Sequence, residues 1–151
     1  MNILVLLEPR CELTTGSLTT VLAASQLARR EGMELHAVWP GEGAGEQAGR
    51  LAGLGISNLH AVREEIFPTL SHEAWIPFLA DLAASLEARL IVAPASALGK
   101  AWCAALAARV GAELAQDCVS LDTTVDGIPM ARKPMYAGKI IADLRLRSSP
   151  S

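Results

Sequence analysis

The stretch ARLIVAPASALGKAWCAALAARVG, Ala88 to Gly111, decides the fold class of this chain. It opens with a short apolar run, Ala88–Pro94, whose length and branched residues are typical of a strand buried on both faces. Ser96 follows, and its hydroxyl can cap a helix by accepting a hydrogen bond from a backbone N–H of the first turn. Gly111 supplies the residue type that commonly ends a helix. The stretch therefore predicts a strand, a tight turn and an alanine-rich helix in succession.

Three more pairs of strand and helix are predicted upstream. The strands are NILVLLE, MELHAVWP and NLHAV, which are residues 2–8, 33–40 and 58–62. Strands that alternate with helices form a parallel sheet with right-handed crossovers and helices on both faces, so the predicted class is α/β. The helices are predicted from Thr14 or Thr15 to Gly32, from about Ala44 to Leu54, and from Ser71 onward, where Pro77 requires a kink or a later start.

The rhythm changes after Gly111. Turn signals at Asp126-Gly127 and Ala137-Gly138 separate alternating segments, a pattern typical of an antiparallel meander that ends in a β hairpin. We expect one domain over residues 1–147 and a short polar tail over residues 148–151.

The charge of the chain is unevenly distributed. Residues 131–151 carry five Lys or Arg and one acid, a net charge of +4, whereas the remainder carries eight basic and fifteen acidic residues, a net charge of −7. A basic terminal segment on an acidic body can meet an acidic partner or phosphate, and it can equally be a solvated hairpin.

Several classes of protein are disfavoured by composition. The cysteines, Cys11, Cys103 and Cys118, are odd in number and lack CxxC spacing, which indicates neither a disulfide framework nor a zinc site. The N-terminus lacks a basic region before its short apolar run, and no stretch approaches the roughly 18 apolar residues of a membrane span. We expect a soluble cytoplasmic protein without a nucleic-acid or membrane partner.

PASALGKA, residues 94–101, lies where a strand passes into a helix, a position suited to binding an anion. A Walker-type phosphate loop is rejected because Pro94 and Ala101 stand where that motif needs Gly and Ser or Thr. Two interpretations of Ser96, Gly99 and Lys100 stay open. They can contact a phosphate or carboxylate at the carboxyl edge of the sheet, or they can be a helix cap, a close-packed glycine and a surface lysine.

Other conspicuous residues are expected to serve the fold. GEGAGE, residues 41–46, lacks the last glycine of a dinucleotide fingerprint and is interpreted as a turn. No spacing lets two histidines share a metal, and no nucleophile with its base emerges, so we expect no enzyme activity. Core positions are favoured over an interface for the tryptophans, and a core or semi-buried thiol is expected at Cys103. The histidines are His36, His60 and His72, and the tryptophans are Trp39, Trp75 and Trp102.

The run from Leu90 to Asp122, with ARKPMYAGK after it, resembles the N-terminal domain of the electron transfer flavoprotein alpha subunit. That family has a strand, an S-x-x-G-K turn, an alanine-rich helix, an Asp at the start of a strand and an R-P-x-Y-A-G-N segment. The resemblance extends from about Asn2 to Arg147. The matching residues are Ser96, Gly99, Lys100, Asp117, Pro134, Tyr136, Ala137 and Gly138.

The chain departs from that family in two ways. Lys133 separates Arg132 from Pro134, and Lys139 stands where the family has Asn. The chain also ends where the FAD-binding C-terminal domain of the family would begin, so no flavin-binding residue is carried over. The resemblance implies a Rossmann-like fold of the adenine-nucleotide-binding type, shared with universal stress proteins.

The function implied by the resemblance is that of a non-catalytic scaffold in electron transfer. It would pair with a beta-type subunit or a separate FAD domain, and a homodimer is left open. FAD is expected in the assembled complex and not in this domain alone, because no second lobe is evident to enclose it. The hairpin is expected to be the docking edge, with bends fixed by Pro134 and Gly138. The predicted interface residues are Arg132, Pro134, Tyr136, Gly138 and Lys139.

The alternative is a regulatory module that binds AMP or ATP at the carboxyl edge of the sheet. A third possibility is a gene product without independent activity. The residues expected for the nucleotide site are Leu7, Glu8, Trp39, Ser96, Gly99 and Lys100.

Overall fold

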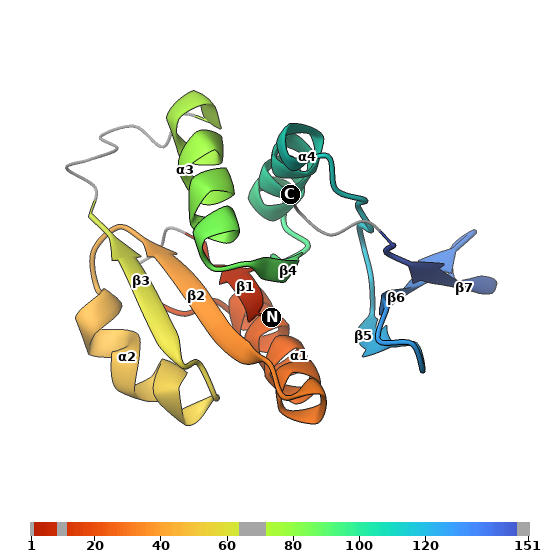
Figure 1. Cartoon of the computed structure of the whole chain (residues 1–151), viewed down its shortest axis with the longest axis horizontal. Helices are drawn as coiled ribbons and strands as arrows, with labels where there is room; N and C mark the ends of the chain where they lie inside the picture. The colour runs from red at the N-terminus through yellow and green to blue at the C-terminus, as the bar shows by residue number, and fades with distance from the viewer. Residues whose placement is uncertain (1, 9–11, 64–71, 148–151) are drawn as a thin grey trace.

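The structure, a computed structural model, describes residues 2–8, 12–63 and 72–147. The first eight elements are β1 (Asn2–Leu6), α1 (Thr15–Glu31), β2 (Glu34–Pro40), α2 (Ala44–Gly53), β3 (Asn58–Val62), α3 (His72–Ser85), β4 (Ala88–Val92) and α4 (Ala97–Val110). The four strands form a parallel sheet in the order β3-β2-β1-β4. Helices α1 and α2 cover one face and α3 and α4 cover the other (Figure 1). The predicted α/β, Rossmann-like class is confirmed.

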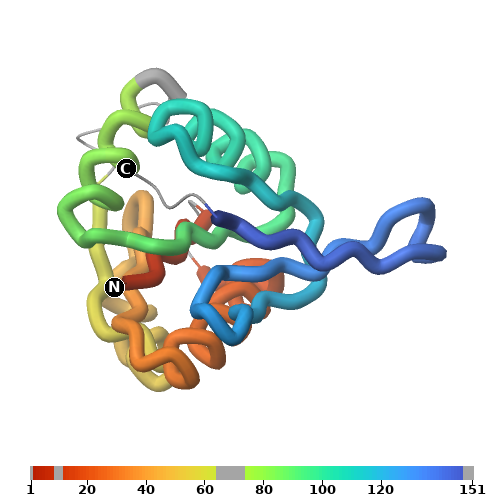
Figure 2. Tube along the Cα trace, turned by 45° about the vertical axis from the view of Figure 1, so that its right-hand side comes forward, coloured from red at the N-terminus to blue at the C-terminus, as the bar shows by residue number. Residues whose placement is uncertain are grey.

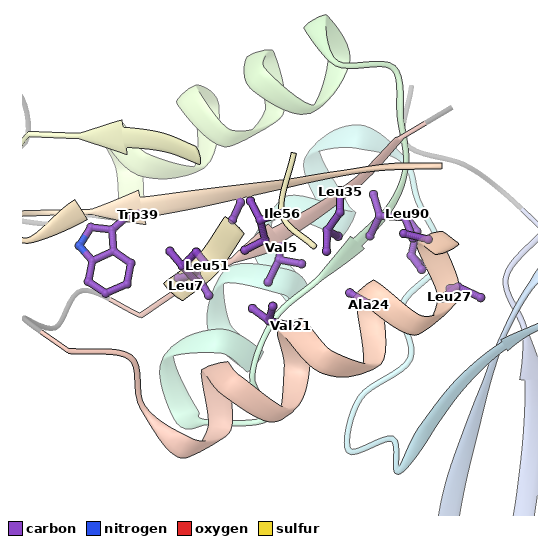
Figure 3. Packing of buried hydrophobic residues seen from close by; sticks show 13 residues of the cluster. Val5, Leu7, Val21, Ala24, Leu27, Leu35, Trp39, Leu51, Ile56 and Leu90 are labelled. Carbon is purple, nitrogen blue, oxygen red and sulfur yellow. The ribbon is translucent and has the colours of Figure 1, made fainter. Parts of the chain in front are cut away.

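Strand β1 carries the core of both layers. Its side chains alternate, so that Ile3 and Val5 pack towards α1 whereas Leu4 and Leu6 pack towards α3 and α4. Figure 3 shows the α1 side, where aliphatic side chains from β1, β2 and α1 interdigitate. The predicted core positions of the tryptophans are confirmed, because Trp39, Trp75 and Trp102 are each only 1% exposed.

The helix ends follow the predicted signals. Thr14 caps α1 and Ser96 caps α4, each by accepting a hydrogen bond from a first-turn N–H, and Gly32 and Gly111 end these helices in the left-handed conformation. Helix α3 contains Pro77 in its second turn and begins at His72. The predicted cap at Ser71 lies outside the described residues, as does the predicted tail, residues 148–151.

A second, antiparallel sheet follows α4. Its strands are β5 (Ser120–Thr123), β6 (Pro129–Met135) and β7 (Ile140–Arg145), in the order β5-β6-β7. The β6–β7 hairpin extends away from the body of the domain (Figure 2). Gly138 lies in its turn at φ 83°, as predicted.

The predicted role of Pro134 at a bend is wrong. Pro134 lies inside β6, opposite Ile141 of β7. Proline is tolerated in a strand where its missing N–H faces away from the neighbouring strand. The bend is instead made by Tyr136 and Ala137, which both have positive φ, 52° and 55°. This is the pattern of turn that matches the twist of hairpin strands.

We expect Gly99→Ala to destabilise the fold by about 1–3 kcal/mol, because a Cβ at this position would lie 2.0 Å from the backbone carbonyl oxygen of Pro94. Urea unfolding measures the change. Gly49→Ala is the matched control, since Gly49 lies inside α2 with nothing within 4 Å of its added Cβ, and it should stabilise by about 0.5–1 kcal/mol. Equal effects of the two substitutions would contradict the close contact.

Candidate functional site

A cavity of about 900 Å³ lies beside β4, the edge strand of the parallel sheet. It is bounded by α1 on one side, by α4 on the other and by residues 112–121 opposite β4. One end of the cavity reaches the carboxyl ends of β1 and β4. From β1 the chain adds β2 and β3 on one side and then β4 on the other, so the order of the strands switches between β1 and β4. Open α/β sheets bind ligands at such a switch point.

The structure brings Ser96, Gly99 and Lys100 together at this end of the cavity. The Ser96 Oγ accepts a hydrogen bond of 3.1 Å from the Gly99 N–H, so the hydroxyl serves as the cap of α4. The Lys100 Nζ lies 2.5 Å from Oδ1 of Asp117. All three residues therefore have a partner within the chain, and the anion site stays a prediction.

The residues expected for the nucleotide site separate into two groups. Glu8 lines the same end of the cavity, where its carboxylate accepts a hydrogen bond of 3.2 Å from the Thr14 hydroxyl. Leu7 and Trp39 are buried in the core on the α1 face and do not line the cavity. The Trp39 Nε1 donates to the backbone carbonyl of Glu42.

The connection from α4 to β5 is the part of the site that sequence reasoning missed. Asp117 was expected at the start of a strand, but it lies before β5 with a φ of 57°. Asp tolerates this left-handed conformation better than most residues, which is the signal that the sequence offers. The side chain of Gln116 donates to the Lys100 carbonyl at 3.2 Å. Gln116 and Asp117 thus attach this connection to the first turn of α4.

The two cysteines that line the cavity are poor nucleophiles. Burial raises the pKa of Cys103 to about 11 and also raises the pKa of Cys118. Because the thiolate is the reactive form, a raised pKa lowers the reactivity of a thiol at neutral pH. The prediction of a core or semi-buried thiol at Cys103 is confirmed in its second form, because Cys103 is partly buried, and Cys11 lies outside the described residues.

Two histidines that the sequence separated lie together on the sheet. The His36 Nδ1 is 3.1 Å from the His60 Nε2, and the rings are stacked. In the register of β2 and β3, His60 lies opposite Val38. Val38 is two residues from His36 on β2 and its side chain points to the same face of the sheet, so this register brings the two histidine rings together. Burial, and secondly the charge of His36, lowers the pKa of His60. Within the described part of the chain, no three His, Cys, Asp or Glu side chains form a group that could hold a metal.

The predicted interface residues all lie in the β6–β7 hairpin. Arg132 on β6 forms an ion pair of 2.8 Å with Asp143 on β7. Gly138 and Lys139 are exposed in the turn, and the Tyr136 side chain there is 71% exposed. The structure adds three exposed apolar neighbours to Tyr136, and we call the four residues the apolar tip. They are Met135, Tyr136, Ile140 and Ile141.

Polar contacts attach the antiparallel sheet to the end of α1. The Arg30 guanidinium lies 2.6 Å from the Asp122 carboxylate, and the Thr123 hydroxyl donates to Glu31. The hydrogen bond from Thr123, and then that from Arg30, lowers the pKa of Glu31. The backbone N–H of Thr123, followed by the charge of Arg30, lowers the pKa of Asp122. These contacts set where the base of the hairpin lies.

Comparison with known proteins places these observations in context. A family model described as the electron transfer flavoprotein domain matches residues 3–151. The electron transfer flavoprotein subunit alpha of Clostridium acetobutylicum is 26% identical over 134 residues, which are 88% of this chain and 40% of that protein. The subunit alpha of Thermoanaerobacterium thermosaccharolyticum is 22% identical over 122 residues, 81% of this chain and 37% of that protein. The chain thus spans about two-fifths of the length of these curated relatives.

Among the described helices, none has the length and apolar character needed to cross a bilayer.

We expect Glu31→Gln to lower the melting temperature near pH 7 more than Glu12→Gln, which removes the same charge from an exposed loop. The lowered pKa of Glu31 means that its stabilising contribution is complete above the unfolded value, about 4.3, and is lost as pH falls through the lower folded value. The difference between the two variants should therefore shrink as the pH falls below about 4.3. Because Glu31 is only partly buried and its partner Arg30 is exposed, the difference should be small and should shrink with added salt. Thermal melts from pH 3 to pH 7 test this, and a pH-independent difference would contradict it.

Proposed function

The chain belongs to the electron transfer flavoprotein domain family, and from that premise we propose that it is a non-catalytic scaffold domain of a cytoplasmic electron-transfer complex. Its partner is a beta-type subunit or a separate flavin domain. The similarity to alpha subunits supports this pairing. The matched region is 40% of the length of one such subunit and 37% of the length of another.

The observation that carries the proposal is the apolar tip of the β6–β7 hairpin. Its four side chains are between 39% and 71% exposed, although each is large and apolar. Met135 and Ile140 lie opposite each other and share one face of the hairpin, whereas Ile141 points to the other face. Apolar side chains that share an exposed face mark interaction sites more often than singly exposed ones. Lys133 on β6 and Lys139 in the turn lie close to them in the chain. The tip therefore suits a partner with an apolar patch and an acidic rim.

The hairpin is also prepared to bind without much reordering. Strands β6 and β7 pair over six residue positions, from Met130 opposite Arg145 to Met135 opposite Ile140. The cross-strand ion pair of Arg132 and Asp143 adds to this pairing. A segment that is already ordered loses less conformational entropy on association, which favours affinity.

The residues of the cavity do not fit FAD, which the family implies for the assembled complex. Three carboxylates, Glu8, Glu113 and Asp117, line the cavity against two cations, Arg89 and Lys100. The resulting net negative charge of the cavity lining disfavours the pyrophosphate of a dinucleotide. Ser96 and Lys100 are also engaged by Gly99 and Asp117. We therefore derive no redox step through this cavity and expect FAD to be held elsewhere in the complex.

A second candidate function is a module that binds AMP or ATP. It is favoured by one observation, the convergence of the capped N-termini of α1 and α4 at the carboxyl ends of β1 and β4. A phosphate there would have to take Lys100 from Asp117. Titration calorimetry with AMP and with ATP decides this candidate. Binding tighter than millimolar that Lys100→Met abolishes would support it, and an absence of binding up to millimolar would end it.

We expect Tyr136→Ala to weaken association with the partner at least tenfold while leaving the melting temperature nearly unchanged. Tyrosine is a frequent hot-spot residue, and its loss from an interface typically costs about 2 kcal/mol or more. Co-purification with a beta-type subunit and with a separately expressed flavin domain measures the association, through the mass of the complex and the flavin absorbance. The mass also distinguishes a heterodimer from a homodimer.

Val125→Ala is the matched control for this experiment, because Val125 is a fully exposed apolar residue in the other turn of the same sheet. It should not change the association. Loss of folding in Tyr136→Ala, or unchanged association, would overturn the docking role. A purified chain that carries stoichiometric flavin without a partner would overturn the proposal that FAD is held elsewhere.

A further inference from the structure

His36 on β2 is one of the few polar side chains that the described part of the chain buries. The residue is 5% exposed and lies on the face of the sheet that α3 and α4 cover, where Leu4 of β1 is its neighbour in the strand pairing. Burying a polar group costs free energy unless a partner satisfies it. The stability of this position therefore depends on what the two ring nitrogens of His36 contact.

The ring nitrogens of His36 face two different groups. The Nδ1 lies 3.1 Å from Nε2 of His60, which comes from the neighbouring strand β3. The Nε2 lies 3.4 Å from a carboxylate oxygen of Glu34, and it makes no hydrogen bond to a described residue. His60 is half-buried and Glu34 is exposed. Both partners of the buried ring thus reach solvent, so its environment can respond to pH.

The contact between the two imidazoles has room for one proton. When both rings are neutral, one nitrogen carries a hydrogen and donates it to the lone pair of the other. One added proton can be carried at a nitrogen outside the contact, so the hydrogen bond survives. When both rings are cationic, all four nitrogens carry hydrogens, and two N–H groups face each other across 3.1 Å. That state has no hydrogen bond and two adjacent like charges.

Glu34 is the carboxylate that an ion-pair contact brings to this pair, and it favours a proton on Nε2 of His36. Strand β1 has no charged residue. The described charged residues of the helices on the same face, none of which forms an ion pair with either histidine, are Asp81, Lys100 and Arg109. Helices α1 and α2 lie on the opposite face. Their charged residues are Arg29, Arg30, Glu31, Glu46 and Arg50. The described surroundings therefore favour one added proton and not a second.

The contact joins β2 to β3, a strand that otherwise has few buried side chains. Among the described strands, β3 pairs with β2 alone. Val62 at the end of β3 is buried, whereas the four residues before it are exposed or half-buried. Segments with few buried apolar contacts open most easily. Besides the backbone pairing, the histidine contact is thus a substantial part of what holds β3 against the sheet.

We infer that His36 and His60 form an acid-sensitive latch between β2 and β3. The latch is closed while at least one of the two rings is neutral, and it opens when both rings are protonated. Opening releases β3 and exposes its apolar side chains Leu59 and Val62, while β1 stays paired with its neighbours. Strand β3 lies at the other end of the strand order from β4, and the inference does not rest on the proposed function.

The direction of the pH effect follows from the preference of the folded chain for a neutral His60. Burial, and secondly the charge of His36, lowers the pKa of His60. The resulting contribution to stability is fully present above the unfolded value, about 6.5, and is lost as the pH falls through the lower folded value. Carboxylates such as Glu31 titrate below about 4.3, so measurements above about pH 5 report on the histidines.

Amide hydrogen exchange of the purified chain, followed by NMR at pH 7.5 and pH 5.0, tests the latch. After correction for intrinsic exchange rates, we expect the amides of β3 to lose about fivefold or more of their protection at pH 5.0. The amides of β1 should change by less than about twofold. EDTA in both samples ensures that no metal ion competes with protons for the imidazoles. The imidazole resonances of the pair should titrate in two separate steps.

Two substitutions should remove the pH response. His60→Gln and His36→Gln each delete one titrating ring and keep a side chain that can form hydrogen bonds, so the protection of β3 should change by less than about twofold between the two pH values. His72→Gln is the matched control, because His72 is the remaining histidine of the chain, and it should keep the full loss. The second variant keeps the test decisive if the first one does not fold.

Three results would overturn the latch. They are unchanged protection of β3 at pH 5.0, an equal loss of protection in β1 and β3, and a loss in His60→Gln as large as that in the unmodified chain. The test does not depend on the Tyr136→Ala experiment, because neither histidine lies in the hairpin. The latch and the docking role of the hairpin therefore stand or fail separately.

Discussion

The close approach of Gly99 to the Pro94 carbonyl is the contact on which the arrangement around the cavity depends. It allows the chain to turn directly from β4 into α4, with Ser96 as the cap between them. The first turn of α4 is thereby held against the end of the sheet, where Lys100 reaches Asp117 and orders the connection that follows the helix. Any side chain at residue 99 would move α4 outward. The α4 wall of the cavity and residues 112–121, which also line it, would move with the helix.

The parallel sheet is fully buried at its central strand β1 and only partly buried at β4. Strand β1 is covered on both faces and flanked on both edges, so its apolar side chains are fully removed from water. Strand β4 has the same two covering layers, and among the described strands it pairs with β1 alone. Its residues Ile91 and Val92 are accordingly only partly buried.

The base of the hairpin lies beside the cavity, which Ala131 of β6 and Leu146 help to line. Polar contacts between α1 and β5 fix the antiparallel sheet on the body. From that base the hairpin carries its apolar tip outward, where it contributes nothing to the core. Exposed apolar side chains on an ordered hairpin do not stabilise an isolated domain, so their place at the tip favours a role in association.

The sequence by itself determined the elements and the class of fold. Runs of branched apolar residues, the caps Thr14 and Ser96, and the terminating glycines act within a few residues of chain, so their effects can be predicted locally. The resemblance to alpha subunits rested on short motifs of the same kind. Tertiary structure alone decided the cavity beside β4 and the contact of His36 with His60, because strand order and register join residues far apart in the chain. It also decided that Asp117 pairs with Lys100 and that Pro134 lies inside a strand. Local patterns carry no information about which edge of a sheet stays open, since that depends on every other strand.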